Sequence, residues 1–128
     1  MQGSLNRVLY VEDDEIIAEL AIMAMEDFGN LTVRHCLSGR EALAIVSEFQ
    51  PELVLLDMMM PDMDGMDTLK HLRKLPEGTS LPAVFMSAKV QAHEQEAYLN
   101  AGANGVIAKP FDPLELSNKL QEIWLAAQ

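Results

Sequence analysis

The chain contains the stretch Leu53-Val54-Leu55-Leu56-Asp57, an unbroken apolar run that ends in an acid. A second run, Val8-Leu9-Tyr10-Val11, leads into Glu12-Asp13-Asp14. Such runs are typical of strands that are buried on both faces of a parallel sheet. The carboxyl ends of parallel strands lie at one edge of the sheet, so the two acidic ends are expected to meet there. Carboxylates at such ends are costly unless a cation or a reaction requires them.

Short apolar runs alternate with segments of helical spacing along the whole chain. The runs are Arg7–Val11, Leu31–Cys36, Leu53–Leu56, Ala83–Met86 and Gly105–Ala108. Five strands alternating with five helices predict parallel pairing through right-handed crossovers. The expected fold is α/β: a doubly wound five-stranded parallel sheet in the flavodoxin-like order 2-1-3-4-5, a (βα)5 three-layer sandwich. Arg34 and His35 make Leu31–Cys36 the candidate edge strand.

The first and last helices have the most detailed predictions. The expected buried stripe of the first consists of Ile17, Leu20, Ala21, Ala24 and Phe28, with Gly29 as the stop. For the last, Asp112 is the expected N-cap, Pro113 the first helical residue and Glu115 the third. Its expected stripe is Leu116, Leu120, Ile123, Trp124 and Ala127.

The three middle helices are expected between turn signals. Ser38-Gly39-Arg40-Glu41 fits a capping box for the second, which should end before Pro51. The third should follow Gly65. The fourth, near Ala92–Ala101, is only weakly amphipathic and should end at Gly102.

Composition limits the classes of function. With 128 residues, the chain is expected to be a single domain over residues 1–128. Residues 1–4 carry no pattern, so they could be native, an expression remnant or disordered. There are 9 Lys and Arg against 20 Asp and Glu, and the net charge of −11 argues against binding to nucleic acid or membrane. A single cysteine, no signal peptide and no membrane-length apolar run predict a cytoplasmic protein.

The acidic strand ends predict a metal site. Carboxylate and carbonyl oxygens are ligands preferred by Mg²⁺, and an open site with few acids suits this ion or Mn²⁺. We expect Asp13 and Asp57 to bind the ion directly and Glu12 to bind it through water. The backbone carbonyl of Met59 could add another oxygen.

Two further strand ends supply the groups that a phosphoryl transfer needs. A carboxylate such as Asp57 can attack phosphorus and form an aspartyl phosphate. Lys109 and the metal would balance the charge of the transferring oxygens, and Ser87 could donate a hydrogen bond to one of them. Taken singly, an acid after a strand is most often a turn or cap residue, and Asp14 is expected to be the cap of the first helix. The combination of four strand ends favours phosphoryl chemistry.

Several stretches of the chain together match one known family. They are Val11-Glu12-Asp13-Asp14, Leu56-Asp57-Met58-Met59-Met60-Pro61-Asp62-Met63-Asp64-Gly65, Met86-Ser87-Ala88 and Ala108-Lys109-Pro110-Phe111. With them, the chain resembles the receiver domain of two-component response regulators, the CheY-like superfamily, over essentially its whole length. The resemblance implies a cis Lys109-Pro110 bond and these roles: Asp57 as phosphoacceptor, Glu12 and Asp13 as acidic metal pair, Ser87 as switch hydroxyl and Lys109 as phosphate-facing lysine.

The resemblance also implies a partner and an output. A sensor histidine kinase or histidine phosphotransfer protein would phosphorylate Asp57. The face formed by the helix near Ala92–Ala101, the strand Gly105–Ala108 and the last helix would then change and control a downstream protein or output domain. Such a domain is regulatory, with only phosphotransfer to itself and autodephosphorylation as intrinsic activities. Homodimerisation is left open.

One position departs from the family pattern. Many members have a switch aromatic three residues before the lysine, where this chain has Val106. Valine fills less volume, so the coupling would be weaker or would use other groups such as Tyr98 or Phe85.

Three alternatives remain. A phosphatase of the haloacid dehalogenase type normally has a second aspartate two residues after its nucleophile, where this chain has Met59. A flavodoxin-like flavin carrier has a phosphate-binding loop rich in Ser, Thr and Gly, whereas Glu12-Asp13-Asp14 would repel the phosphate. A receiver-like interaction module that acts without phosphorylation is kept open by Val106.

Overall fold

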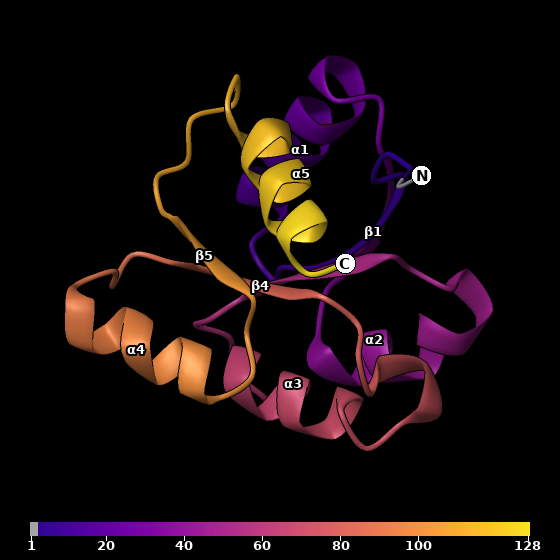
Figure 1. The fold of residues 1–128 in the computed structure, drawn as a ribbon, viewed down its shortest axis with the longest axis vertical. Helices are drawn as coiled ribbons and strands as arrows, with labels where there is room; N and C mark the ends of the chain where they lie inside the picture. Colours follow the sequence, from indigo (N-terminus) through magenta and orange to yellow (C-terminus); the bar gives the residue numbers. More distant parts are fainter. Residues whose placement is uncertain (1–2) are drawn as a thin grey trace.

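The computed structural model describes residues 3–128, which form a five-stranded parallel sheet with helices on both faces (Figure 1). In chain order the elements are β1 (Arg7–Val11), α1 (Glu15–Met23), η1 (Ala24–Phe28), β2 (Thr32–Cys36), α2 (Gly39–Phe49), β3 (Leu53–Asp57), α3 (Gly65–Leu72), η2 (Pro76–Gly78), β4 (Ala83–Ser87), α4 (Ala92–Asn100), β5 (Gly105–Ala108) and α5 (Leu116–Ala126). The strand order is β2-β1-β3-β4-β5. The predicted flavodoxin-like architecture is confirmed.

The expectation for residues 1–4 can be compared with the structure only at Gly3 and Ser4. Met1 and Gln2 lie outside the described residues. Gly3 and Ser4 are exposed and belong to no helix or strand.

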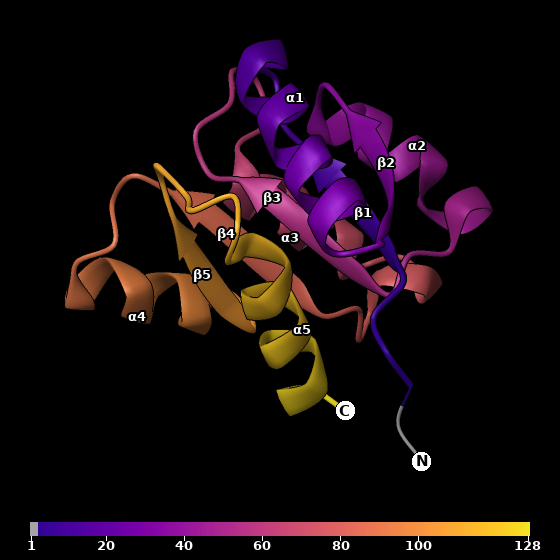
Figure 2. The same ribbon diagram turned by 90° about the horizontal axis from the view of Figure 1, so that it is seen from above.

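The helices form one layer on each face of the sheet. Figures 1 and 2 show α1 and α5 on one face and α2, α3 and α4 on the other. Because successive side chains of a strand point to opposite faces, Val8 and Tyr10 join the core under α1 and α5, whereas Leu9 and Val11 join the other core. All five residues of β3 are buried, which explains its unbroken apolar run. The strand β2 lies at an edge, as predicted.

The first helix buries only part of the predicted stripe: Ala21 and Ala24 are buried, as predicted, whereas Ile17 is half-buried. Leu20 and Phe28 are 51% and 57% exposed, so the prediction was wrong for both. The buried residues of α1 and of the π-helical turn η1 are Ala18, Ala21, Ala24 and Met25. Both stripes have helical spacing, and the observed one includes Ala18 and Met25 in place of Leu20 and Phe28. The predicted stop is confirmed, since Gly29 caps η1.

The second helix forms only half of its predicted capping box. The Ser38 hydroxyl accepts a hydrogen bond from the Glu41 N–H at 3.2 Å. The Glu41 carboxylate instead accepts from the Leu37 N–H at 3.4 Å. The helix ends at Phe49, where Gln50 adopts a left-handed conformation with φ of 52°, one residue before Pro51.

The last helix begins later than predicted. A carboxylate oxygen of Asp112 accepts from the Leu114 N–H at 2.9 Å, which closes a turn over residues 113–115, and α5 starts at Leu116. Its buried residues are Leu116, Leu120 and Trp124, while the predicted Ile123 is half-buried and Ala127 is exposed. Within residues 3–128, no helix is long and apolar enough to cross a membrane.

Candidate functional site

The structure brings the predicted polar groups to one edge of the sheet. Glu12 and Asp13 directly follow β1, and Asp57 is the last residue of β3. Ser87 is the last residue of β4, and Lys109 directly follows β5. The strands β1 and β3 are neighbours at the point where the strand order reverses, so their acidic ends lie side by side.

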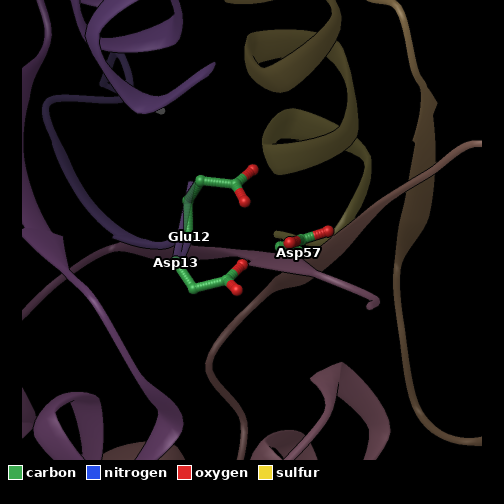
Figure 3. Close-up of side chains that lie close together, drawn as sticks. All are labelled: Glu12, Asp13 and Asp57. Atoms are coloured by element: carbon green, nitrogen blue, oxygen red, sulfur yellow. The ribbon is translucent and has the colours of Figure 1, made fainter. Parts of the chain in front are cut away.

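Three carboxylates gather at this edge, as Figure 3 shows. Glu12, Asp13 and Asp57 each offer an oxygen, and these oxygens lie within 4.8 Å of one another. Glu12 is 0% and Asp57 2% exposed, whereas Asp13 faces solvent. A set of oxygen donors that is open on one side fits a hard divalent cation such as Mg²⁺ or Mn²⁺ better than a metal that prefers sulfur.

Lys109 is the counter-charge of the two buried acids. Its ammonium nitrogen lies 2.9 Å from Oδ1 of Asp57 and 3.1 Å from Oε1 of Glu12. Desolvation alone would lower the pKa of Lys109, but the hydrogen bonds and negative charges of Asp57 and Glu12 outweigh it and raise the pKa above its ordinary value. Lys109 is therefore a permanent cation in contact with Asp57.

Glu12 holds its proton more tightly than an exposed glutamate. Burial is the main cause, followed by the hydrogen bond with Asp57 and the negative charge of that residue, and together they raise the pKa of Glu12 to about 7, although Lys109 acts in the opposite direction. A divalent cation in the cluster would remove the repulsion between the acids. The electrostatics therefore favour a second positive charge beside Lys109.

Two residues that the sequence analysis did not assign to the site support Glu12. The Tyr10 hydroxyl donates to Oε1 of Glu12 at 3.4 Å, and a ring nitrogen of His35 lies 2.8 Å from the backbone oxygen of Glu12. Burial and the charge of Glu12 raise the pKa of Tyr10, so its phenol stays a donor. The signal was present in the sequence, since residues two apart on a strand point to the same face and Tyr10 precedes Glu12 by two.

The Ser87 hydroxyl forms hydrogen bonds on the α4 side of the sheet. Its Oγ is 3.0 Å from the hydroxyl of Tyr98, and the Lys89 N–H donates to it at 3.0 Å. Val106 lies in β5, half-buried, directly across from Phe85 of β4.

A family comparison gives the decisive observation. The family model described as the response regulator receiver domain matches residues 8–121. The chain belongs to this family. It is therefore a receiver domain of the two-component signalling type, regulatory in kind, and its Lys109-Pro110 bond is cis, as the resemblance implied.

Relatives and solved structures agree with this assignment. An uncharacterised 14.6 kDa protein of Leptolyngbya boryana is 35% identical over 93% of this chain and 90% of its own length. The DNA-binding response regulator MtrA of Mycobacterium tuberculosis is 37% identical over 91% of this chain and 49% of its own length. The chain thus spans about half the length of MtrA.

Two crystal structures share the receiver fold. The chemotaxis protein CheY4 of Vibrio cholerae superposes with a TM-score of 0.86 at 27% identity, covering 94% of this chain and 99% of that one. A putative response regulator of Chloroflexus aurantiacus has a TM-score of 0.85 at 30% identity, covering 94% and 98%.

Proposed function

We propose that this receiver domain accepts a phosphoryl group on Asp57 with Mg²⁺ or Mn²⁺ bound and then changes its α4–β5–α5 face. The observation that carries the proposal is the contact of 2.9 Å between Lys109 Nζ and Oδ1 of Asp57, a carboxylate that is 2% exposed. A buried acid in contact with a fixed cation and next to two further acids fits a nucleophile that receives an anionic group.

The transfer itself needs one bond made and one broken. An oxygen of Asp57 attacks the phosphorus of a phosphohistidine, and the P–N bond breaks with its electron pair returning to the imidazole nitrogen. The ring leaves as neutral imidazole when its other nitrogen carries the proton. The N–H of Met59 and the ammonium of Lys109 both bind Oδ1 of Asp57, at 3.3 and 2.9 Å, so we assign the attack to Oδ2.

The side chains around Asp57 would divide the remaining tasks. Asp13 and Asp57 would bind the metal directly, Glu12 would bind through water, and the carbonyl of Met59 would add an oxygen. A bound divalent ion would neutralise charge on the phosphoryl oxygens. Lys109 would hold a transferring oxygen from the other side with its permanent charge.

The output of the site would pass through β4 and β5. The Ser87 hydroxyl would turn to donate to a phosphoryl oxygen, and Val106 would follow as the residue at the family's switch position. The changed α4–β5–α5 face would control a downstream protein or an output domain.

The donor we propose is a sensor histidine kinase or a histidine phosphotransfer protein. A hollow of about 370 Å³ with mainly apolar walls borders Lys109. It is lined by Ile17, Leu20, Ala88, Lys109, Pro110, Phe111 and Pro113. Apolar surface beside the lysine suits a protein donor better than a small, charged one.

Incubation with acetyl phosphate and Mg²⁺, followed by intact-mass spectrometry, tests the proposal. We expect one added phosphoryl group on the unaltered protein and none on Asp57→Asn. The matched control is Asp14→Asn, because Asp14 is the N-cap of α1 and an asparagine keeps that cap. An unlabelled protein would contradict the proposal and favour the interaction module that acts without phosphorylation. A labelled Asp57→Asn would also contradict it, because another residue would then carry the phosphoryl group.

A further inference from the structure

The hydroxyl of Ser87 belongs to a closed ring of hydrogen bonds. Its Oγ lies 3.0 Å from the Tyr98 hydroxyl and accepts from the Lys89 N–H at 3.0 Å. The Tyr98 hydroxyl in turn donates to the Lys89 carbonyl at 2.9 Å. A hydroxyl has a single hydrogen, so when Tyr98 donates to Lys89, the hydrogen between the two side chains must come from Ser87. The Ser87 Oγ also lies 3.3 Å from the Lys89 carbonyl, which already accepts from Tyr98, so the shorter contact of 3.0 Å with Tyr98 is the main target of its single hydrogen.

Tyr98 is the residue of α4 that packs into the core of the domain. Of the nine residues of α4, all within the described part of the chain, Tyr98 alone is buried, at 5% exposed. Its ring packs edge-on against Phe85 of β4, with centroids 5.5 Å apart. The ring and the hydroxyl of Tyr98 therefore make the buried contacts of α4 with β4.

Val106 cannot make the polar contact with Ser87 that Tyr98 makes. It lies half-buried in β5 across from Phe85, and it carries neither a ring nor a hydroxyl. The polar link between the end of β4 and the neighbouring helix is made by Tyr98 instead.

We infer that Tyr98 reads the state of the site: a phosphoryl group on Asp57 takes the Ser87 hydrogen from Tyr98 and thereby loosens α4. This inference rests on the proposed function. Phosphoryl oxygens are anionic acceptors, and hydrogen bonds to them are stronger than those to a neutral phenol. When Ser87 turns to the phosphoryl group, the buried Tyr98 oxygen loses its donor, which destabilises the position of α4.

The coupling must work in both directions. If phosphorylation loosens α4, then a domain in which Tyr98 no longer competes for Ser87 has less to lose when Asp57 is phosphorylated. Tyr98 is a positioning residue in this scheme, because it acts on the site only through Ser87.

Hydrogen exchange of the α4 amides with and without acetyl phosphate and Mg²⁺ measures this coupling. In the unaltered protein we expect exchange in α4 to rise by about five- to tenfold on phosphorylation, the effect of one lost hydrogen bond. Tyr98→Phe keeps the ring on Phe85 but removes the hydroxyl. Its α4 should exchange faster before phosphorylation and change little afterwards.

Two further variants separate the inference from a general loss of structure. Ser87→Ala removes the same bond from the other side, so adding Tyr98→Phe to it should bring no additional increase in exchange. Leu99→Ala changes an exposed residue of the same helix and should keep the full α4 response.

The outcomes distinguish this inference from the function on which it rests. A protein that gains the phosphoryl group but shows equal α4 exchange in both states would overturn the role of Tyr98 alone, as would a normal response in Tyr98→Phe. If acetyl phosphate labels no protein, as judged by mass, the proposed function fails and the inference fails with it.

Discussion

At the ends of β1, β3 and β5, two buried acids share the positive charge of one lysine. Glu12 and Asp57 are almost inaccessible to water, and Lys109 contacts both. Charges in such surroundings are stable only when paired, so removal of any one of the three side chains should destabilise the charges of the other two.

Replacement of Lys109 by methionine should destabilise the metal-free protein. We expect a loss of about 1–3 kcal/mol, because Glu12 and Asp57 would be left buried without a counter-charge while Lys109 itself is partly exposed. Added Mg²⁺ should recover part of the loss. Urea unfolding with and without Mg²⁺ measures both effects. Lys119→Met, on the exposed side of α5, is the control and should cost less than about 0.5 kcal/mol.

Metal affinity should depend on pH through Glu12. Its pKa of about 7 in the metal-free protein means that the carboxyl must lose a proton before it can support the ion. Affinity should therefore rise with pH, by up to about tenfold between about pH 6 and pH 8. Calorimetric titration with Mg²⁺ checks this. Glu12→Gln should bind more weakly with a flatter profile, and an equally flat profile in the unaltered protein would refute the role of Glu12.

Among the elements, the start of α3 packs directly on the strand that carries Asp57. A methyl group on Gly65 would lie 2.7 Å from the backbone oxygen of Asp57 and 3.0 Å from Cα of Met58. Backbone atoms of a central strand cannot move aside cheaply. The close approach therefore fixes the loop that leads out of the site.

Gly65→Ala should both destabilise the fold and slow the labelling of Asp57. We expect a cost of about 1–3 kcal/mol, typical of overpacking. Gly3→Ala is the matched control, because nothing lies within 4 Å of a methyl group there. Denaturant midpoints and the rate of labelling by acetyl phosphate measure the two effects, and a Gly65→Ala protein equal to the control in both would show that the contact is unimportant.

The elements differ in how far the sequence could predict them. Strands such as β3 could be predicted because burial on both faces leaves an unbroken apolar run. The buried side of α1 could be predicted only in part, since apolar residues occupy two adjacent stripes that share Ala21, and only packing on the sheet selects Ala18 over Leu20. The start of α5 was missed because the Asp112 side chain closes a turn before the helix begins.

The sequence predicted the residues of the site more completely than the contacts around them. Strand ends in a doubly wound sheet converge by topology, so the order of the elements was enough to bring Asp13, Asp57 and Lys109 to one edge. The contact between Ser87 and Tyr98 joins a strand end to a helix with weak amphipathicity. Its existence depends on how α4 is rotated, which periodicity did not define.

For the whole molecule, metal binding and folding should be linked. A metal ion that binds only the folded protein stabilises it by mass action, by about 2.7 kcal/mol when Mg²⁺ is at 100 times its dissociation constant. We expect the urea midpoint to rise with Mg²⁺ concentration. Asp13→Asn is a sharp comparison, because Asp13 is exposed and its replacement should remove the shift with little cost to the metal-free fold. A shift of the same size in Asp13→Asn would exclude it as a ligand.

The proposed function depends most on the identity of the phosphorylated residue. After labelling with acetyl phosphate and Mg²⁺, reduction with borohydride converts an aspartyl phosphate into homoserine and releases phosphate. Peptide mass spectrometry then locates the converted residue. We predict homoserine at position 57 alone. Conversion at Asp13 or at another acid, or no conversion in a protein that binds Mg²⁺, would contradict the assignment of Asp57 as the phosphoacceptor.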